Sequence, residues 1–212
     1  MNQEERSQRS KAHILNAALD LFSHQGYRAT SIRDVADAAG VSTGNVYHHF
    51  KDKEAIFRAL LDEYWAAIED PNLEFNRALA TGTFPDNLET IGRAARDMIR
   101  KYRRHIALIY VDVIEFEGTH IRKFYASMSE RFEAFARSHR ELVPADRRLR
   151  PGISLGAALM LATRFYMNYY AVEELFGVPN HFGKNSDDAL REVADVLRHG
   201  LLAHEDVVGQ AR

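Results

Sequence analysis

The chain has 212 residues, of which 46% are hydrophobic and 27% charged, and it contains no cysteine. This length and composition predict a globular protein with one domain of ordinary size and a small second one. The absence of cysteine excludes a disulfide framework, a thiolate nucleophile and a zinc-finger site. No apolar run reaches the roughly 18 residues of a membrane span, and the polar N-terminus lacks a signal-peptide core. We therefore expect a cytoplasmic protein without a membrane partner.

The formal net charge is −2, and residues 1–53 carry seven Lys and Arg against six Asp and Glu. Binding of a nucleic acid would therefore depend on where a few charges lie and not on an overall positive field. The candidates for phosphate contacts precede the first predicted helix or flank the motif that follows it: Arg6, Arg9, Lys11, Arg28, Arg33, Lys51 and Lys53. For each of them, a merely solvated role fits the sequence equally well.

The first predicted helix covers about Ser10 to Gln25 and ends at Gly26, a residue type that commonly terminates helices. Its apolar positions recur at helical spacing and predict one buried face: Ile14, Leu15, Ala18, Leu21 and Phe22.

The next stretch, residues 31–50, predicts two short helices joined by a tight turn. Ser31 and Asp34 form a capping box at the start of the first helix. Gly40 stands where a left-handed C-cap residue is needed, and Ser42 can cap the second helix. Two short helices joined by a glycine-containing turn form the helix-turn-helix unit, which places its second helix in the major groove of DNA.

The second of these helices, Thr43 to Phe50, carries little charge and many hydrogen-bonding groups. Val46 and Phe50, four residues apart, are its apolar anchors. The other side chains can bond base edges and phosphates, and a glycine allows a sugar-phosphate strand to approach closely: Ser42, Thr43, Gly44, Asn45, Tyr47 and His48. Lys53 follows where the next helix begins, and its ammonium and the free N–H groups there can hold a phosphate. The alternative is a small helical subdomain whose polar helix is simply solvated.

The run from Gly26 to Glu54 reads G-Y-x-A-T-S-I-x-D-V-A-x-A-A-G-V-S-x-G-x-V-Y-x-H-F-x-x-K-E. It resembles the DNA-binding signature of the TetR/AcrR family of transcriptional regulators over nearly thirty consecutive positions, although Asn45 stands where family members vary freely. The resemblance implies DNA contacts at four positions: Thr30, Thr43, Tyr47 and His48. We add Ser31 and Arg33 as further candidates, and for Tyr47 a half-buried ring with an outward hydroxyl is the alternative.

Residues 53–68 are the predicted connector between two subdomains, because their apolar positions cover too wide a stripe for a single contact. Asp70-Pro71 ends this helix, since a residue before proline avoids the α region. After a short helical segment around residues 73–79, further helices are predicted over residues 87–102, 106–116 and 119–142.

Two long helices, residues 154–176 and 187–202, follow near the end of the chain. The first is apolar nearly all round, and the second, capped by Ser186, has a clean apolar stripe. This apolar surplus favours a four-helix bundle shared by two subunits, and the resemblance implies the same, because members of the family dimerise through their last two long helices. The expected interface residues of the homodimer are Leu155, Leu159, Tyr166, Tyr170, Leu190, Val193, Leu197 and Leu201.

Aromatic and methionine side chains concentrate between Tyr64 and Tyr170, among polar groups that would need a partner if they were buried. Such a stripe is more often plain core, but it also fits a pocket for a small apolar or aromatic ligand. The candidate lining residues are Tyr64, Trp65, Tyr102, His105, Tyr110, Glu115, Phe124, Met128, Phe132, Arg164, Phe165 and Asn168. Arg164 would hold an acidic group of the ligand, or it would form an internal ion pair with Asp112 or Glu115.

Metal and catalytic motifs are not evident. Glu115, Glu117 and His120 are poorly spaced for one helix face, and His199 and His204 are five residues apart. The sequence contains no G-x-S-x-G, Walker loop, G-x-G-x-x-G or H-E-x-x-H motif. We therefore expect no metal, no cofactor and no enzymatic activity.

The sequence thus predicts an all-α protein of about nine helices. Residues 8–68 are the expected helix-turn-helix DNA-binding domain, with the motif at 31–50, and residues 69–212 the expected effector-binding and dimerisation domain. The favoured function is a dimeric repressor that a small molecule releases from a palindromic operator in double-stranded DNA. The resemblance implies that the ligand shifts the helix over residues 53–68. The alternatives are a DNA-binding regulator without a small effector, such as an activator, and more distantly a helical enzyme or lipid carrier.

Overall fold

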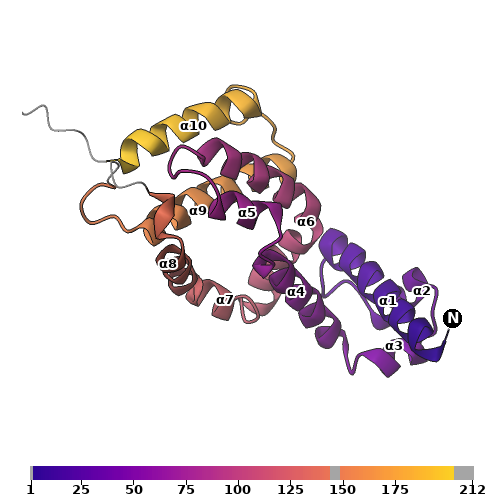
Figure 1. Ribbon diagram of the computed structural model, residues 1–212. Coiled ribbons are helices and arrows are strands. Elements are labelled where there is room, and N and C mark those ends of the chain that lie inside the picture. The colour runs from indigo at the N-terminus through magenta and orange to yellow at the C-terminus, as the bar shows by residue number, and fades with distance from the viewer. Residues whose placement is uncertain (1, 144–148, 203–212) are drawn as a thin grey trace, which may run out of the picture. The chain divides into compact units, whose positions relative to one another are not determined.

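Within residues 2–143 and 149–202, which the computed structural model describes, the secondary structure is helical apart from an isolated bridge between Leu149 and Leu202. Ten α-helices, α1 to α10, and the 3₁₀-helix η1 (Arg140–Leu142) follow one another along this part of the chain (Figure 1). The all-α prediction is therefore confirmed. None of the described helices combines the length and the apolar character that a bilayer span requires.

The chain divides into two compact units, each made of two segments. The first unit comprises Met1–Asp70 and Tyr102–Tyr125, and the second comprises Pro71–Lys101 and Ala126–Arg212. The end of the first segment lies close to the predicted boundary at residues 68 and 69. Residues 102–125, however, pack with the N-terminal helices, although the sequence interpretation assigned them to the C-terminal domain.

The first unit contains α1 (Gln3–Gln25), α2 (Ile32–Ala39), α3 (Thr43–His49), α4 (Lys53–Glu69), the second half of α6 (Leu88–Phe116) and most of α7 (Arg122–Ala126). These helices enclose one apolar core, to which α1 to α4 and α6 all contribute. Its largest members are fully buried: Ile14, Phe22, Ile56, Phe57, Leu60 and Leu108.

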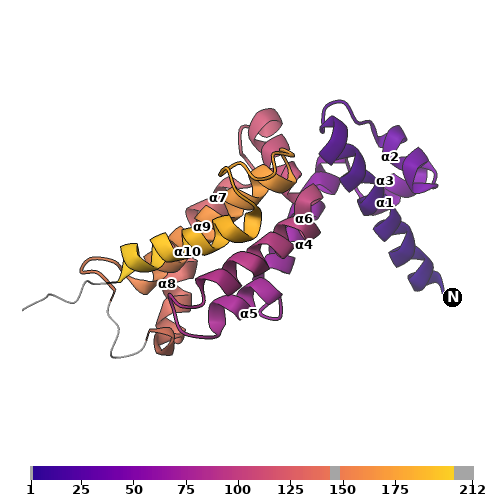
Figure 2. The same cartoon turned by 90° about the horizontal axis from the view of Figure 1, so that it is seen from above.

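The first helix starts seven residues earlier than predicted, at Gln3. Asn2 caps it, because the Asn2 side chain accepts a hydrogen bond from the backbone N–H of Glu5 at 2.7 Å and the Glu5 carboxylate accepts the N–H of Asn2 at 2.9 Å. Arg6, Arg9 and Lys11 were expected before the helix but lie on it. The first turns of α1 extend past α2 and α3 (Figure 2).

The second unit contains α5 (Glu74–Ala80), the first half of α6, α8 (Met128–Ser138), α9 (Leu155–Glu174) and α10 (Ser186–Leu201). Helices α6, α9 and α10 meet at Gly92, where an added Cβ would lie only 3.0 Å from a ring carbon of Tyr166 and closer still to Leu190. The side chain of Asn185 caps α10 by accepting the N–H of Asp188, so the predicted cap at Ser186 is one residue off.

Two predicted boundaries in the middle of the chain are wrong. The predicted helices 87–102 and 106–116 are one helix, α6, with a kink at Tyr102 (φ −105°, ψ 16°). The predicted helix 119–142 is interrupted: α7 ends at Ala126, α8 begins at Met128, and η1 follows. Neither proline nor glycine stands at the kink or at the break.

Candidate nucleic-acid interface

The helix-turn-helix is formed by α2 and α3, and the predicted capping residues and turn glycine occupy the expected positions. The Ser31 hydroxyl accepts the N–H of Asp34 at 3.1 Å, and the Asp34 carboxylate accepts the N–H of Ser31 at 2.8 Å. Hydrogen bonds from Ser31 lower the pKa of Asp34. Gly40 adopts the left-handed conformation (φ 67°, ψ 34°), which suits a residue without Cβ, and Ser42 caps α3 through the N–H of Asn45.

Helix α3 is anchored by one buried residue within it and a second one just after it, and it has a polar exposed face. Val46 is fully buried and Phe50, just after the helix, is nearly so. Seven residues of the predicted contact set are exposed: Ser31, Arg33, Ser42, Thr43, Gly44, Tyr47 and His48. Tyr47 is 55% exposed, so a large part of its side chain is accessible to a partner. An exposed tyrosine and histidine on a short helix can reach the edges of bases in a groove.

Asn45, also predicted to bind DNA, is only partly exposed, because it packs toward α1. The hydroxyl of Ser10 donates a hydrogen bond to its side-chain oxygen. One residue on, the Lys11 ammonium lies 5.8 Å from the centroid of the Phe50 ring. These two contacts tie α1 to α3 and to Phe50 after it, and they place the Lys11 ammonium beside this helix.

Two predicted DNA contacts, Thr30 and Lys53, point into the protein. Thr30 is 1% exposed, and its hydroxyl donates to the carbonyl of Gly26 at 2.8 Å. The Lys53 ammonium donates to the carbonyls of Tyr27 and Thr30, each at 2.6 Å, and lies 4.1 Å from the Tyr27 ring centroid. Burial lowers the pKa of Lys53. In this conformation neither side chain is free to meet a phosphate.

Glu115 was predicted to line a ligand pocket, and the structure corrects this. Its carboxylate accepts the backbone N–H of Tyr27 at 3.0 Å and that of Arg28 at 2.6 Å. The Arg28 guanidinium in turn donates to the backbone carbonyl of Glu115 at 3.0 Å. Nothing in the local sequence around Glu115 signals this role, because its partners lie nearly ninety positions away.

A second polar contact set in the same unit involves Asp112, which is fully buried. Its carboxylate lies 2.5 Å from Nδ1 of His120 and accepts the N–H of Ile121 at 3.3 Å. Nε2 of His120 lies 3.4 Å from the Glu54 carboxylate. Among the described residues no group of three or more potential metal ligands is arranged to hold an ion, and His204 lies outside them.

The predicted pocket residues are divided between the two units. Tyr64, Trp65, Tyr102, His105, Tyr110, Glu115 and Phe124 belong to the first, and Met128, Phe132, Arg164, Phe165 and Asn168 to the second. In the first unit Trp65 stacks on Phe124, with ring centroids 4.0 Å apart, and Tyr64 stacks on His105 at 5.9 Å. Burial, with a smaller effect of Arg104, lowers the pKa of His105 to about 4. These aromatics pack against one another, as core residues do.

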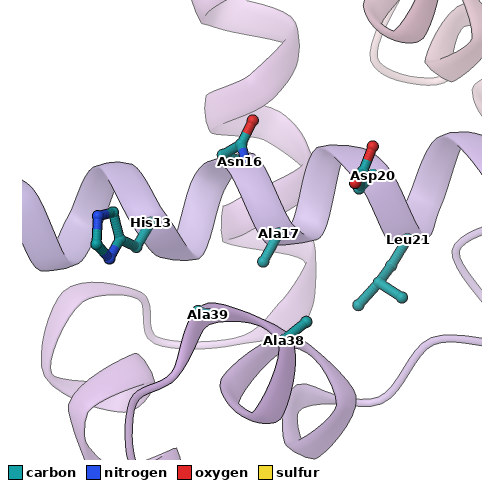
Figure 3. Close-up of a pocket in the computed structure, with 7 residues that line it drawn as sticks. All are labelled: His13, Asn16, Ala17, Asp20, Leu21, Ala38 and Ala39. Carbon is teal, nitrogen blue, oxygen red and sulfur yellow. The ribbon is translucent and has the colours of Figure 1, made fainter.

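A cavity of about 260 Å³ lies instead along the groove between α1 and α2 (Figure 3). It is lined by His13, Asn16, Ala17, Asp20, Leu21, Ala38 and Ala39, none of which was predicted to bind a ligand. Figure 3 shows that α1 contributes the first five side chains and α2 the two alanines. Three of the seven lining side chains, those of His13, Asn16 and Asp20, are polar, so this groove lacks the predominantly apolar and aromatic lining of a typical ligand pocket.

The predicted dimer interface also needs correction. Five of its eight residues are buried inside a single chain: Leu159, Tyr166, Tyr170, Leu190 and Leu201. They form the core of the second unit and cannot also face a partner. Leu155, Val193 and Leu197 are partly exposed. The large apolar side chains that do stand out from α9 and α10 are Leu161, 53% exposed, and Val196, 65% exposed.

Comparison with known proteins concerns mainly the N-terminal part of the chain. The family model described as bacterial regulatory proteins, tetR family, matches residues 14–60, which contain α2, α3 and parts of α1 and α4. The HTH-type transcriptional regulator AcrR of Shigella flexneri is 40% identical over 72 residues, which is 34% of each chain. The HTH-type transcriptional repressor KstR2 of Rhodococcus jostii is 46% identical over 57 residues, 25% of this chain and 28% of the relative. The chain thus spans about a third or less of these relatives.

Similarity to solved structures extends over nearly the whole chain, whereas the matching sequences cover about a third of it or less. The crystal structure of a TetR family transcription regulator from Marinobacter aquaeolei VT8 superposes with a TM-score of 0.63. The superposition covers 95% of this chain and 100% of that one, at 14% sequence identity. At this identity the likeness concerns the fold alone.

Proposed function

We propose that this chain, a member of the TetR family of bacterial regulatory proteins, is a sequence-specific DNA-binding transcriptional regulator. The observation that supports this most directly is the exposed polar face of α3. Tyr47 and His48 project from a helix that is fixed to the core by Val46 and capped by Ser42. A recognition helix held in this way can present the same hydrogen-bonding groups at every encounter with a base edge.

Affinity would come from cations around this face. Arg33 and Lys51 are exposed next to α2 and α3, and Arg6, Arg9 and Lys11 are exposed along α1. Phosphate contacts of this kind position a protein on the duplex without reading sequence, and they make binding dependent on salt. Because the net charge of the whole chain is −2, the basic side chains near α3 must carry this contribution.

The regulator is proposed to act as a homodimer on a palindromic operator. Two recognition helices related by a two-fold axis read half-sites about one DNA turn, roughly 34–36 Å, or a multiple of it apart. Since much of the interface expected from sequence is buried within one chain, we assign the contact to the outward faces of α9 and α10, where Leu161 and Val196 are exposed. A two-fold interface uses the same surface of both subunits, and burial of these two side chains against a partner would remove them from water.

The finer proposal is a repressor released by a small apolar or aromatic ligand. The similarity to the transcriptional repressor KstR2 of Rhodococcus jostii supports repression. A ligand that moves the population from 1:99 to 99:1 must prefer the released form by about 5.5 kcal/mol. The tight aromatic packing of Tyr64, Trp65 and Phe124 equally suits a regulator without a small effector, which remains the second candidate. A helical enzyme or lipid carrier is the third, and it predicts no selective DNA binding.

The DNA-binding proposal is tested by selection from a pool of random-sequence duplexes with the purified protein. We expect an inverted repeat to be enriched within a few rounds. Enrichment of no sequence, at salt concentrations that suppress non-specific binding, would contradict the proposal.

The ligand proposal is tested by native mass spectrometry of the protein purified from its expression host. A stoichiometric added mass on the dimer would indicate a bound small molecule. If removal of this molecule increased the affinity for the operator, the result would support release by a small molecule. A dimer without added mass that also binds its operator at full affinity would favour the regulator without an effector.

A further inference from the structure

The turn between α1 and α2, residues 26–30, is held from two sides by side chains that lie outside the helix-turn-helix. On the N–H side, the Glu115 carboxylate accepts the amides of Tyr27 and Arg28 at 3.0 and 2.6 Å. On the carbonyl side, the Lys53 ammonium donates to Tyr27 and Thr30. The turn thus lies between an anion and a cation, each of which bonds two backbone groups of the matching kind.

The contact with Glu115 is tight as well as polar. A Cβ at Gly26, which has a φ of 87°, would lie 2.7 Å from Oε1 of Glu115. The side chain of Glu115 is only 13% exposed, whereas that of Arg28 is 76% exposed. The carboxylate is therefore shielded from water by the turn, and charge-assisted bonds to backbone amides keep most of their strength in such a position.

The turn leads directly into the elements proposed to meet DNA. Thr30 is followed by Ser31, the N-cap of α2, and α2 carries Arg33 and packs against α3. A displacement of the turn moves the start of α2 and with it the exposed residues that follow. Glu115 fixes this start from α6, a helix that begins in the second unit.

We propose that Glu115 is a positioning residue for DNA recognition. Its carboxylate holds the turn over residues 26–30 so that α2 and α3 are pre-arranged for specific binding, although Glu115 itself touches no DNA. The inference rests on the proposed function, since it assigns a role in operator recognition. It differs from a purely structural role because it predicts a loss of sequence discrimination beyond any loss of stability.

The test is Glu115→Gln, with Glu117→Gln as the matched control. Glutamine keeps one oxygen acceptor but presents an NH₂ group, which cannot accept a backbone amide. Glu117 stands two residues away at the end of α6 and is exposed, so its substitution makes the same change of charge without touching the turn. Three quantities are measured: affinity for the selected operator, affinity for a scrambled duplex, and amide hydrogen exchange at Tyr27 and Arg28.

We expect Glu115→Gln to accelerate exchange at both amides and to weaken operator binding about tenfold, with little change for the scrambled duplex. Glu117→Gln should leave all three quantities within about twofold of the wild type. If Glu115→Gln does not fold, Glu115→Asp, which retains the charge but withdraws the carboxylate by one methylene, is measured in its place. Failure of both variants to fold would identify a residue of global stability and overturn the positioning role.

The remaining outcomes separate the two proposals. Unchanged amide exchange would overturn the contact itself, and faster exchange with an unchanged ratio of specific to non-specific affinity would overturn its role in recognition. An equal effect of Glu117→Gln would show that only the charge matters. If the wild-type protein selects no operator, the proposed function fails, and amide exchange still reports whether Glu115 holds the turn.

Discussion

Tyr47 is more than half exposed, although it stands next to a fully buried residue on a helix of seven residues. A ring exposed to this extent buries little apolar surface in the core, so we expect its function to lie in DNA binding. Tyr47→Ala should weaken operator binding by about 1–3 kcal/mol and leave the mass of the assembly unchanged. Fluorescence anisotropy with the selected duplex measures the first effect. An unaltered operator affinity would remove Tyr47 from the interface.

His105 gives a prediction for pH dependence. Its pKa is lowered from 6.5 in the unfolded chain to about 4 in the folded protein, mainly by burial. Between these values the unfolded state binds a proton that the folded state does not, so this contribution to stability is lost as pH falls from about 6.5 towards 4.

We therefore expect urea denaturation midpoints to fall less steeply over this pH range in His105→Phe than in the wild type, since Phe keeps a ring against Tyr64 and Tyr102. Comparison of the two proteins separates His105 from the carboxylates, which titrate in both. Parallel midpoints would mean that His105 is protonated equally in the folded and unfolded states.

At the residue scale, the sequence predicts which side chains have the right chemistry but not which way they point. The anchors Val46 and Phe50 and the exposed Tyr47 follow from helical spacing alone. Thr30 and Lys53 have the same chemistry as DNA contacts, yet they bond backbone carbonyls of the turn. Their orientation depends on how the turn packs against α4 and α6, which no local pattern encodes.

Among the elements, α6 shows how packing constrains a single position. Gly92 lies in the helix interior, where alanine would gain about 1 kcal/mol from helix propensity. An added Cβ would, however, lie 3.0 and 3.1 Å from two ring carbons of Tyr166, and overpacking of this kind costs about 1–3 kcal/mol. Because the steric cost exceeds the gain in helix propensity, Gly92→Ala is expected to lower the free energy of unfolding in urea denaturation.

Gly200→Ala is the matched control. Gly200 is a helical glycine near the end of α10, and nothing lies within 4 Å of its added Cβ. Without a clash, the propensity gain remains, and the variant should be more stable than the wild type by about 0.5–1 kcal/mol. Stabilisation by both substitutions would show that α6, α9 and α10 are packed less closely than the structure indicates.

The elements themselves were predicted well where caps and glycines mark them. The Ser31, Gly40 and Ser42 signals define α2 and α3, and Ser154 begins α9 as expected. The kink at Tyr102 and the break between α7 and α8 contain neither proline nor glycine. They arise where the chain passes from one compact unit to the other, a tertiary effect that periodicity does not report.

At the scale of the whole molecule, the proposed dimer must use surface that one chain leaves exposed. Leu161→Glu combined with Val196→Glu should convert the dimer to a monomer in light scattering, because two carboxylates would be buried in the interface without partners. Ile114→Glu serves as the control, since Ile114 is 77% exposed but belongs to the first unit. A double variant that remains dimeric would exclude the outward faces of α9 and α10.

The dimer interface and the ligand pocket are harder to predict from the sequence than the fold. Amphipathic patterns identify buried faces but not what covers them. Leu159 and Tyr166, which the sequence analysis assigned to a dimer interface, are buried in the core of the second unit. The predicted pocket residues belong to two compact units, and no local pattern in the sequence marks this division, because α6 contributes to both units. A stripe of aromatic residues in the sequence does not indicate whether the side chains will pack against one another or line a cavity.

Recognition of DNA sequence by α3, as proposed, is decided by the ratio of two affinities. The purified protein is titrated, at one physiological salt concentration, against its selected operator and against the same duplex with both half-sites scrambled. We expect the operator to bind at least about 10³-fold more tightly than the scrambled duplex, and Tyr47→Ala to reduce this ratio. Equal affinities for the two duplexes would mean that the exposed face of α3 carries no sequence recognition.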